Sequence, residues 1–204
     1  MINAARRLIG TLSVVCAVVV AGLLAPSLSV AQTNSVSPSP LLNPCIPSGL
    51  SKPFAPWLDF SRYERAPGGS FENSTWTLSG GAKRVAGSEP YAVTGTLGSF
   101  SLSLPPASSA ESPRTCVDTT YPSIRFFIAG KGSVAVKVVD GRSVIPAGIA
   151  VAGGKWAPTP VMLTASPVLG VLSGGSARVS IRFTALSGSP RIDDVYIDPW
   201  ARCC

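Results

Sequence analysis

The chain has 204 residues, of which 46% are hydrophobic and 13% are charged, and its formal net charge is +7 with no histidine. The absence of histidine excludes the ordinary Ser-His-Asp and Cys-His catalytic pairings, and no Cys-x-x-Cys spacing indicates a zinc site. The basic residues are scattered, apart from Lys83-Arg84, so the charge does not predict nucleic-acid binding.

Residues 1–31 are predicted to be a signal peptide. Arg6-Arg7 supplies a positive start, an apolar run covers 8–24, and Ser29-Val30-Ala31 offers the small residues that signal peptidase accepts. An uncleaved membrane anchor is the alternative, because a spanning helix needs about 20 apolar residues. We therefore expect a secreted, extracellular protein with no membrane contact after cleavage. Loss of two arginines leaves 15 basic and 10 acidic residues, a net charge of +5.

The exported part is expected to contain three regions. A flexible leader rich in Ser and Pro covers 32–44, one folded domain covers 45–200, and a tail with two cysteines covers 201–204. In the folded domain, short apolar-alternating runs are separated by Gly, Pro and Ser, and no 3.6-residue apolar period is sustained. This pattern predicts an all-β sandwich. The expected strands cover 99–104, 123–129, 133–140, 143–152, 160–164, 177–185 and 191–197.

Four cysteines remain after export: Cys45, Cys116, Cys203 and Cys204. Export favours disulfide formation. A bond between the adjacent Cys203 and Cys204 would close a strained ring, so the residues leave Cys45 and Cys116 to bond each other or the tail. We favour the Cys45–Cys116 pairing, which would contribute roughly 4 kcal/mol by restricting the unfolded chain. Capture of either cysteine by the tail pair is the alternative.

The acids near the end of the domain have contrasting expected environments. In an extended strand, Asp193 shares a face with Val195 and Ile197, whereas Asp194 lies on the opposite face. Because desolvating a carboxylate is costly, Asp193 must meet a cation, an arginine or several hydrogen-bond donors. Asp194 and Asp198 are expected to be solvated or satisfied by nearby backbone. Glu72, from the opposite end of the domain, could share a cation with Asp193.

Five motifs occur in an order that resembles the galactose-binding-like jelly-roll superfamily, to which many carbohydrate-binding modules belong. They cover 68–82, 101–105, 154–156, 179–183 and 192–195. A closer likeness, over residues 45–200, is to a group of uncharacterised exported bacterial proteins with the same order of Cys, Gly-Gly-x-Phe-Glu, Cys-Val and Asp-Asp-Val-Tyr-x-Asp-Pro-Trp. The resemblance implies a jelly-roll β-sandwich, and the matching cysteines suggest the Cys45–Cys116 pairing.

The resemblance also implies a structural calcium. In similar modules the Glu after the Gly-Phe turn and the first Asp of the last strand bind this ion, and the matching residues here are Glu72 and Asp193. Hard oxygen ligands suit calcium. Pairing of either acid with an arginine, such as Arg125, is the alternative.

Sugar recognition in this superfamily typically uses exposed aromatic rings together with polar side chains. The candidate ligand-binding residues lie beside Pro, Gly or charged residues, and they are Trp57, Tyr63, Tyr91 and Tyr121. For each of them, packing under a loop is the alternative. The three remaining tryptophans are assigned elsewhere, with Trp76 and Trp156 expected to be buried and Trp200 expected to cover one end of the sandwich.

Together these features favour a secreted, non-catalytic module that binds a polysaccharide or a cell-envelope glycan. The alternative is a structural or adhesive envelope protein without a small-ligand site. A paired-carboxylate hydrolase would need two acids to face each other across a pocket, and the candidates are Glu72, Glu89, Glu111 and Asp140.

Overall fold

The computed structural model describes residues 49–73, 75–118, 122–163 and 176–199. Two compact units, Met1–Pro38 and Ser39–Cys204, are distinguished, and every described residue belongs to the second. The predicted signal peptide, leader and tail therefore lie outside the described residues, as do Cys45, Tyr121 and Trp200. Among the described residues, no helix is long and apolar enough to cross a membrane.

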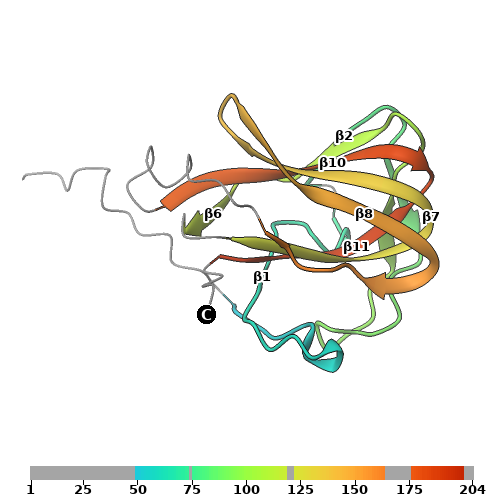
Figure 1. Cartoon of the computed structure of the whole chain (residues 1–204). Coiled ribbons are helices and arrows are strands. Elements are labelled where there is room, and N and C mark those ends of the chain that lie inside the picture. The colour runs from blue at the N-terminus through green and yellow to red at the C-terminus, as the bar shows by residue number, and fades with distance from the viewer. Residues whose placement is uncertain (1–48, 74, 119–121, 164–175, 200–204) are drawn as a thin grey trace, which may run out of the picture. The chain divides into compact units, whose positions relative to one another are not determined.

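The described residues form an all-β fold (Figure 1). In the described part of the chain, the 3-10 turn η2 (Ala55–Trp57) precedes the strands. The strands are β1 (Glu64–Arg65), β2 (Thr77–Ser79), β3 (Lys83–Ala86), β4 (Phe100–Ser103), β5 (Ser109–Glu111), β6 (Thr115–Asp118), β7 (Ser123–Asp140), β8 (Ser143–Pro158), β9 (Met162–Leu163), β10 (Ser176–Gly188) and β11 (Arg191–Asp198). The predicted all-β sandwich is confirmed.

Long strands run through both layers of the sandwich. One edge of β7 pairs first with β11 and then with β10, and the strand order across the fold is β2-β5-β10-β7-β11-β4-β3. The other edge of β7 pairs with β8 over most of its length. One layer therefore contains β2, β5, β10 and the second half of β7. The other layer contains β3, β4, β11 and the first half of β7.

The bend between the layers depends on glycines that face each other. Gly132 in β7 pairs with Gly188 in β10, and their φ angles are +118° and +62°. A Cβ on Gly132 would lie 1.9 Å from the backbone oxygen of Ser187, and one on Gly188 would lie 2.2 Å from that of Lys131. Only glycine allows both the backbone angles and this close approach.

The main core lies between the two layers. Val179, Ile181 and Phe183 of β10 are fully buried, as their alternation predicts. Trp76 is also buried, as expected, with its ring stacked at 5.4 Å on that of Phe183. Its Nε1 donates a hydrogen bond to the Pro67 carbonyl, which satisfies the polar atom of this side chain.

A second core lies on the outer face of β7 and β11, beneath the segment that precedes β1. Phe54, Tyr63, Phe127 and Tyr196 form it, and the ring of Phe54 lies 5.1 to 5.6 Å from the other three. Each buried ring of this size contributes roughly 1.5–3 kcal/mol to stability. The second core therefore fixes residues 51–63 against the sheet.

Candidate functional site

The candidate site begins at an irregularity in β11. Asp193 pairs with Phe127, and Tyr196 pairs with Arg125, so three steps along β11 match two steps along β7. The extra residue forms a β-bulge, in which Asp194 has a φ of +43°.

The bulge overturns the predicted alternation of β11. Cross-strand partners share a face, so Asp193 lies on the outer face with Tyr196, whereas Val195 and Ile197 belong to the main core. The expectation that Asp193 shares a face with Val195 and Ile197 is therefore wrong. One extra residue moves every following side chain to the opposite face.

Asp193 is 1% exposed, and hydrogen-bond donors surround its carboxylate. Oδ2 accepts hydrogen bonds from the Ser88 hydroxyl at 2.6 Å and from the Glu89 N–H at 2.9 Å. Oδ1 accepts one from the Asp194 N–H at 2.8 Å. Burial raises the pKa of Asp193 to about 6 in spite of these hydrogen bonds.

Two further acids are buried beside Asp193. Glu89 is 1% exposed and accepts a hydrogen bond from the Tyr91 N–H, and Asp194 is 5% exposed. Burial, followed by the negative charges of Asp193 and Glu89, raises the pKa of Asp194 to about 7. Arg65 opposes this shift, with Nη1 4.0 Å from Oδ1 of Asp194.

Of the two alternatives expected for Asp194 and Asp198, solvation is wrong, because both are buried in a strand that is covered on both faces. Their satisfaction by nearby backbone stays a prediction. The arginine named as an alternative partner for Glu72 or Asp193 is engaged elsewhere. Arg125 Nη1 donates to Asp59 Oδ2 at 2.6 Å, and its Nε donates to the Thr159 carbonyl.

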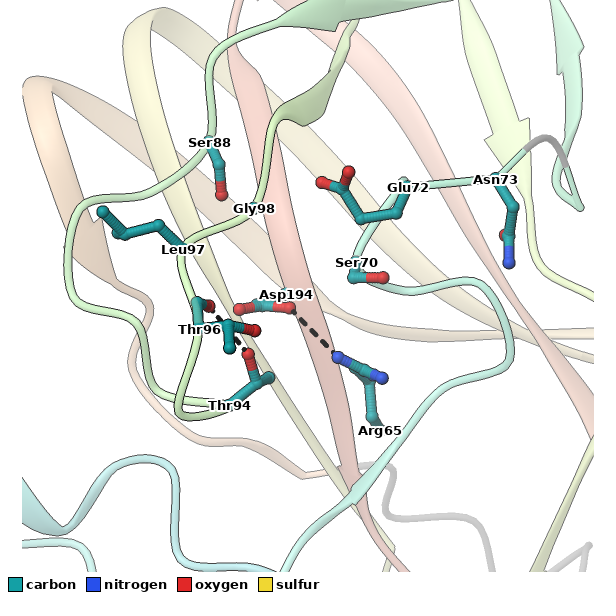
Figure 2. Close-up of a pocket in the computed structure, with 10 residues that line it drawn as sticks. All are labelled: Arg65, Ser70, Glu72, Asn73, Ser88, Thr94, Thr96, Leu97, Gly98 and Asp194. Atoms are coloured by element: carbon teal, nitrogen blue, oxygen red, sulfur yellow. Dashed lines mark hydrogen bonds and ion pairs between the residues drawn. The ribbon is translucent and has the colours of Figure 1, made fainter.

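A polar pocket of about 350 Å³ lies beside the bulge (Figure 2). On this edge of β11, β4 pairs with residues 191–192 and β1 pairs with residues 196–197, so the strand has a gap between its two neighbours. Asp194 lies in this gap and lines the pocket, together with Arg65 and Glu72. The remaining wall comes from two loops: Ser70 and Asn73 lie between β1 and β2, and Ser88, Thr94, Thr96, Leu97 and Gly98 lie between β3 and β4.

Glu72 fixes one end of the loop over residues 87–99. Its Oε1 accepts hydrogen bonds from the Ser99 N–H at 2.8 Å and the Phe100 N–H at 3.0 Å. A Cβ on Gly98 would lie 2.7 Å from this oxygen and 2.6 Å from Oγ of Ser88. Figure 2 shows the Glu72 carboxylate directed toward Ser88 and Gly98. Glu72 and Asp193 therefore hold the same loop, at Ser99 and at Ser88.

The oxygen-rich pocket suits a hard cation in its chemistry, because two carboxylates and several hydroxyl groups line it. Within the described residues, however, no three His, Cys, Asp or Glu side chains are grouped so as to hold a metal ion. The carboxylate that lines the pocket with Glu72 is that of Asp194, whereas Asp193 bonds to Ser88 of the pocket wall. Calcium binding by Glu72 and Asp193 stays a prediction.

The 87–99 loop also carries Tyr91, which lies near two tryptophans. We call Trp57, Tyr91 and Trp156 the aromatic platform. The rings of Trp57 and Tyr91 meet edge to face at 4.9 Å, and both lie against the buried Phe127. The Tyr91 hydroxyl donates to the Trp156 carbonyl at 2.6 Å. Tyr91 is 42% exposed, and the two tryptophans are half-buried.

Arg191 supports the platform from β11. Its guanidinium carbon lies 5.6 Å from the centroid of the Trp156 ring. Its Nη2 also donates to the carbonyls of Ala86 and Gly87, where the loop begins. Sequence reasoning missed Arg191 and Ser88, since neither belongs to a motif and tertiary packing alone brings them to the site.

The predicted ligand-binding residues have different locations. Trp57 and Tyr91 reach the surface together, whereas Tyr63 is 1% exposed. The prediction of Tyr63 as a surface residue is wrong, because its ring packs on Phe54 and its hydroxyl donates to Asp59. Trp156, which was expected to be buried, is half-buried.

The predicted ligand-binding residues and the predicted disulfide each include one residue outside the described part of the chain. Tyr121 is that ligand-binding residue. Cys116 lies in β6 and is half-buried, but Cys45 lies outside the described residues, so their pairing stays a prediction.

No protein-family model matches the chain, and no curated protein matches its sequence. Several solved structures are similar to it at low identity. The C-terminal family 6 carbohydrate-binding module of LamC from Zobellia galactanivorans is 12% identical with a TM-score of 0.43, over 60% of this chain and 90% of that one. The module CBM6cm-2 of Cellvibrio mixtus lichenase 5A, solved with cellotriose, is 14% identical with a TM-score of 0.42, over 65% and 95%.

The enzymatically active domain of bacteriophage CBA120 tailspike protein 4 is 16% identical with a TM-score of 0.42, over 65% of this chain. The chain spans only 20% of that tailspike domain. TM-scores below 0.5 do not establish that this chain shares a function with any of these proteins.

Proposed function

We propose that the protein is a secreted, non-catalytic module that binds a polysaccharide through the aromatic platform. The observation that supports this proposal is that aromatic residues from three separate segments gather over the second core. The rings of Trp57 and Tyr91 meet edge to face, and the Tyr91 hydroxyl bonds to the backbone carbonyl of Trp156, whose side chain packs on the same core. Trp57 comes from η2, Tyr91 from the 87–99 loop and Trp156 from β8. An exposed ring offers a flat apolar face that suits the C–H face of a pyranose, and tyrosine and tryptophan add a polar edge.

The polar pocket provides groups of the kind that bind sugar hydroxyls. Arg65 and the hydroxyls of Ser88, Thr94 and Thr96 line it, and three of these four residues belong to the loop that carries Tyr91. Binding sites for small ligands typically combine aromatic surface with a few fixed polar groups. A polysaccharide, rather than a single sugar, would be long enough to contact more than one part of this loop.

A structural calcium ion would complete this arrangement. The ion would be held at the pocket by Glu72 and Asp193, the predicted pair, with Asp194 as a further carboxylate. It would supply positive charge beside the buried carboxylates, in addition to Arg65, whose Nη1 lies 4.0 Å from Asp194 Oδ1. Its effect would be to secure the loop that presents Tyr91, without a role in chemistry.

The arrangement of the acids supports binding over hydrolysis. Of the four acids considered for a hydrolase, Glu72 lines the pocket, whereas Glu89 is buried and Glu111 pairs with Arg182 at 2.7 Å. Glu72 shares the pocket with Asp194, but its Oε1 is held by two backbone N–H groups of the loop. We therefore assign Glu72 a positioning role, and we expect no cleavage of a bound glycan.

A glycan array probed with the exported protein, with and without a chelator, tests the proposal. Tyr91→Ala should weaken binding to a positive glycan by about fivefold, since a ring contact contributes about 1 kcal/mol. Tyr91→Phe keeps the ring and should bind nearly as wild type. Phe60→Ala is the matched control, because Phe60 is an exposed aromatic residue outside the platform.

Failure of the wild-type protein to bind any glycan would contradict the proposal. It would favour the alternative of a structural or adhesive envelope protein without a small-ligand site. Equal loss of binding in Tyr91→Ala and Phe60→Ala would also count against the aromatic platform as the binding surface.

A further inference from the structure

The segment before β1 holds two apolar side chains out into solvent. Leu58 is 83% exposed and Phe60 is 62% exposed, although their neighbours Trp57 and Asp59 turn toward the sheet. The segment projects from the lower edge of the fold in Figure 1, where its 3-10 turn is drawn in cyan. We call Leu58 and Phe60 the apolar tip.

Contacts with the sheet and the second core fix the backbone that carries the apolar tip. Asp59 accepts hydrogen bonds from Arg125 at 2.6 Å, from the Tyr63 hydroxyl at 2.7 Å and from the Ser61 N–H at 3.1 Å. Phe54 anchors the same segment in the second core. Leu58 and Phe60 are therefore presented by a fixed backbone rather than by a loosely held loop.

The backbone conformation of Leu58 is unfavourable for a leucine. Its φ is +61°, in the left-handed region that favours glycine and asparagine, and its N–H donates to the Ala55 carbonyl. An exposed leucine in this conformation gains no core packing in return for the strain. Residues in strained backbone conformations cluster at functional sites, so the strain at Leu58 indicates that a leucine side chain is needed here for function.

Positive charge flanks the apolar tip. Lys52 and Arg62 are exposed on either side of it in the sequence. The one acid within residues 49–63 is Asp59, which is turned inward and paired with Arg125. The exposed surface of this segment thus combines apolar and cationic side chains without an exposed carboxylate.

We propose that the apolar tip inserts into the interface of an anionic lipid membrane, with Lys52 and Arg62 contacting the headgroups. Leucine and phenylalanine beside lysine and arginine are the residue types that bind at such interfaces. A protein partner is a poorer match, because a stable protein interface buries roughly 800 Å² on each side and two projecting side chains offer far less. The proposal revises the sequence-based expectation of no membrane contact after cleavage.

Co-sedimentation with vesicles of equal parts phosphatidylcholine and phosphatidylglycerol tests the proposal. The protein would begin at Gln32, so that the apolar run of the signal peptide is absent and the compact unit Ser39–Cys204 is complete. The wild-type protein should bind these vesicles, bind pure phosphatidylcholine vesicles less, and lose binding as salt is raised.

The combined change Leu58→Asn and Phe60→Ser should lower the partition coefficient by about tenfold or more. Asparagine tolerates the left-handed conformation, so this variant should fold, and an unchanged melting temperature would verify that it does. Lys52→Gln with Arg62→Gln should also weaken binding and should reduce its dependence on salt. Tyr91→Ala, at the aromatic platform, should bind vesicles as wild type.

Absence of wild-type binding to anionic vesicles would overturn the proposal, and so would wild-type binding by the Leu58→Asn and Phe60→Ser protein. If that protein keeps its binding while the Lys52→Gln and Arg62→Gln protein loses it, the surface recognises anionic charge alone, which also overturns insertion. None of these results depends on whether the protein binds a glycan.

Discussion

The buried carboxyl groups at the β11 bulge predict a protein that is less stable at neutral pH than in mild acid. The folded-state pKa of Asp193 is raised from 3.8 to about 6, so the folded state binds its proton more tightly than the unfolded state does. Its contribution to stability is fully present below pH 3.8 and is lost as the pH rises through 6. Asp194, with a pKa of about 7, acts in the same direction.

The magnitude follows from the size of the shift. A rise from 3.8 to about 6 corresponds to about 3 kcal/mol for Asp193 at about 1.4 kcal/mol per pH unit. Roughly half of this loss should fall between pH 5 and pH 8. Asp59 and Glu111 act oppositely: burial alone would raise the pKa of each, but hydrogen bonds lower it overall. Their contributions are complete above about pH 5.

Urea unfolding between pH 5 and pH 8, in the presence of a chelator, measures this effect. The free energy of unfolding of the wild-type protein should decrease with rising pH, and Asp193→Asn should flatten the slope. Asp140→Asn, at the end of β7 and outside the cluster, is the matched control and should keep the wild-type slope. Stability that rises from pH 5 to pH 8, or an unchanged slope in Asp193→Asn, would refute the reasoning.

Three further predictions concern the bend, the calcium and the crosslink. Gly132→Ala should prevent soluble folding because of the 1.9 Å clash, whereas Gly153→Ala, with nothing within 4 Å, should change the melting temperature little. Calcium at about 100 times its dissociation constant should stabilise the protein by roughly 2.7 kcal/mol. Calorimetry should show that Glu72→Gln loses this increment and Asp140→Asn keeps it. Non-reducing peptide mapping should recover Cys45 linked to Cys116, and reduction should lower stability by about 2–5 kcal/mol; a peptide joining Cys116 to the tail would exclude this pairing.

The sequence by itself determined the all-β class and much of the main core. Alternation in β10 placed Val179, Ile181 and Phe183 inside, because successive side chains of a regular strand point to opposite faces. The burial of Trp76 was also predicted, but it does not follow from strand alternation, because Trp76 precedes β2 and the residues of β2 are exposed. The sequence also indicated that a buried Asp193 must have partners, since the cost of desolvating a carboxylate does not depend on the fold.

Only the tertiary structure decided which face and which partners these residues have. The bulge at Asp194 can be recognised only from the register between β11 and β7. It places Asp193 beside Ser88 rather than in the main core. Tyr63 and Tyr91 were both predicted to lie at the surface, yet Tyr63 is buried against Phe54 and Tyr91 is exposed. Local sequence fixes the period of a strand. Register, bulges and the packing of distant segments depend on contacts between residues far apart in the chain, which no local pattern records.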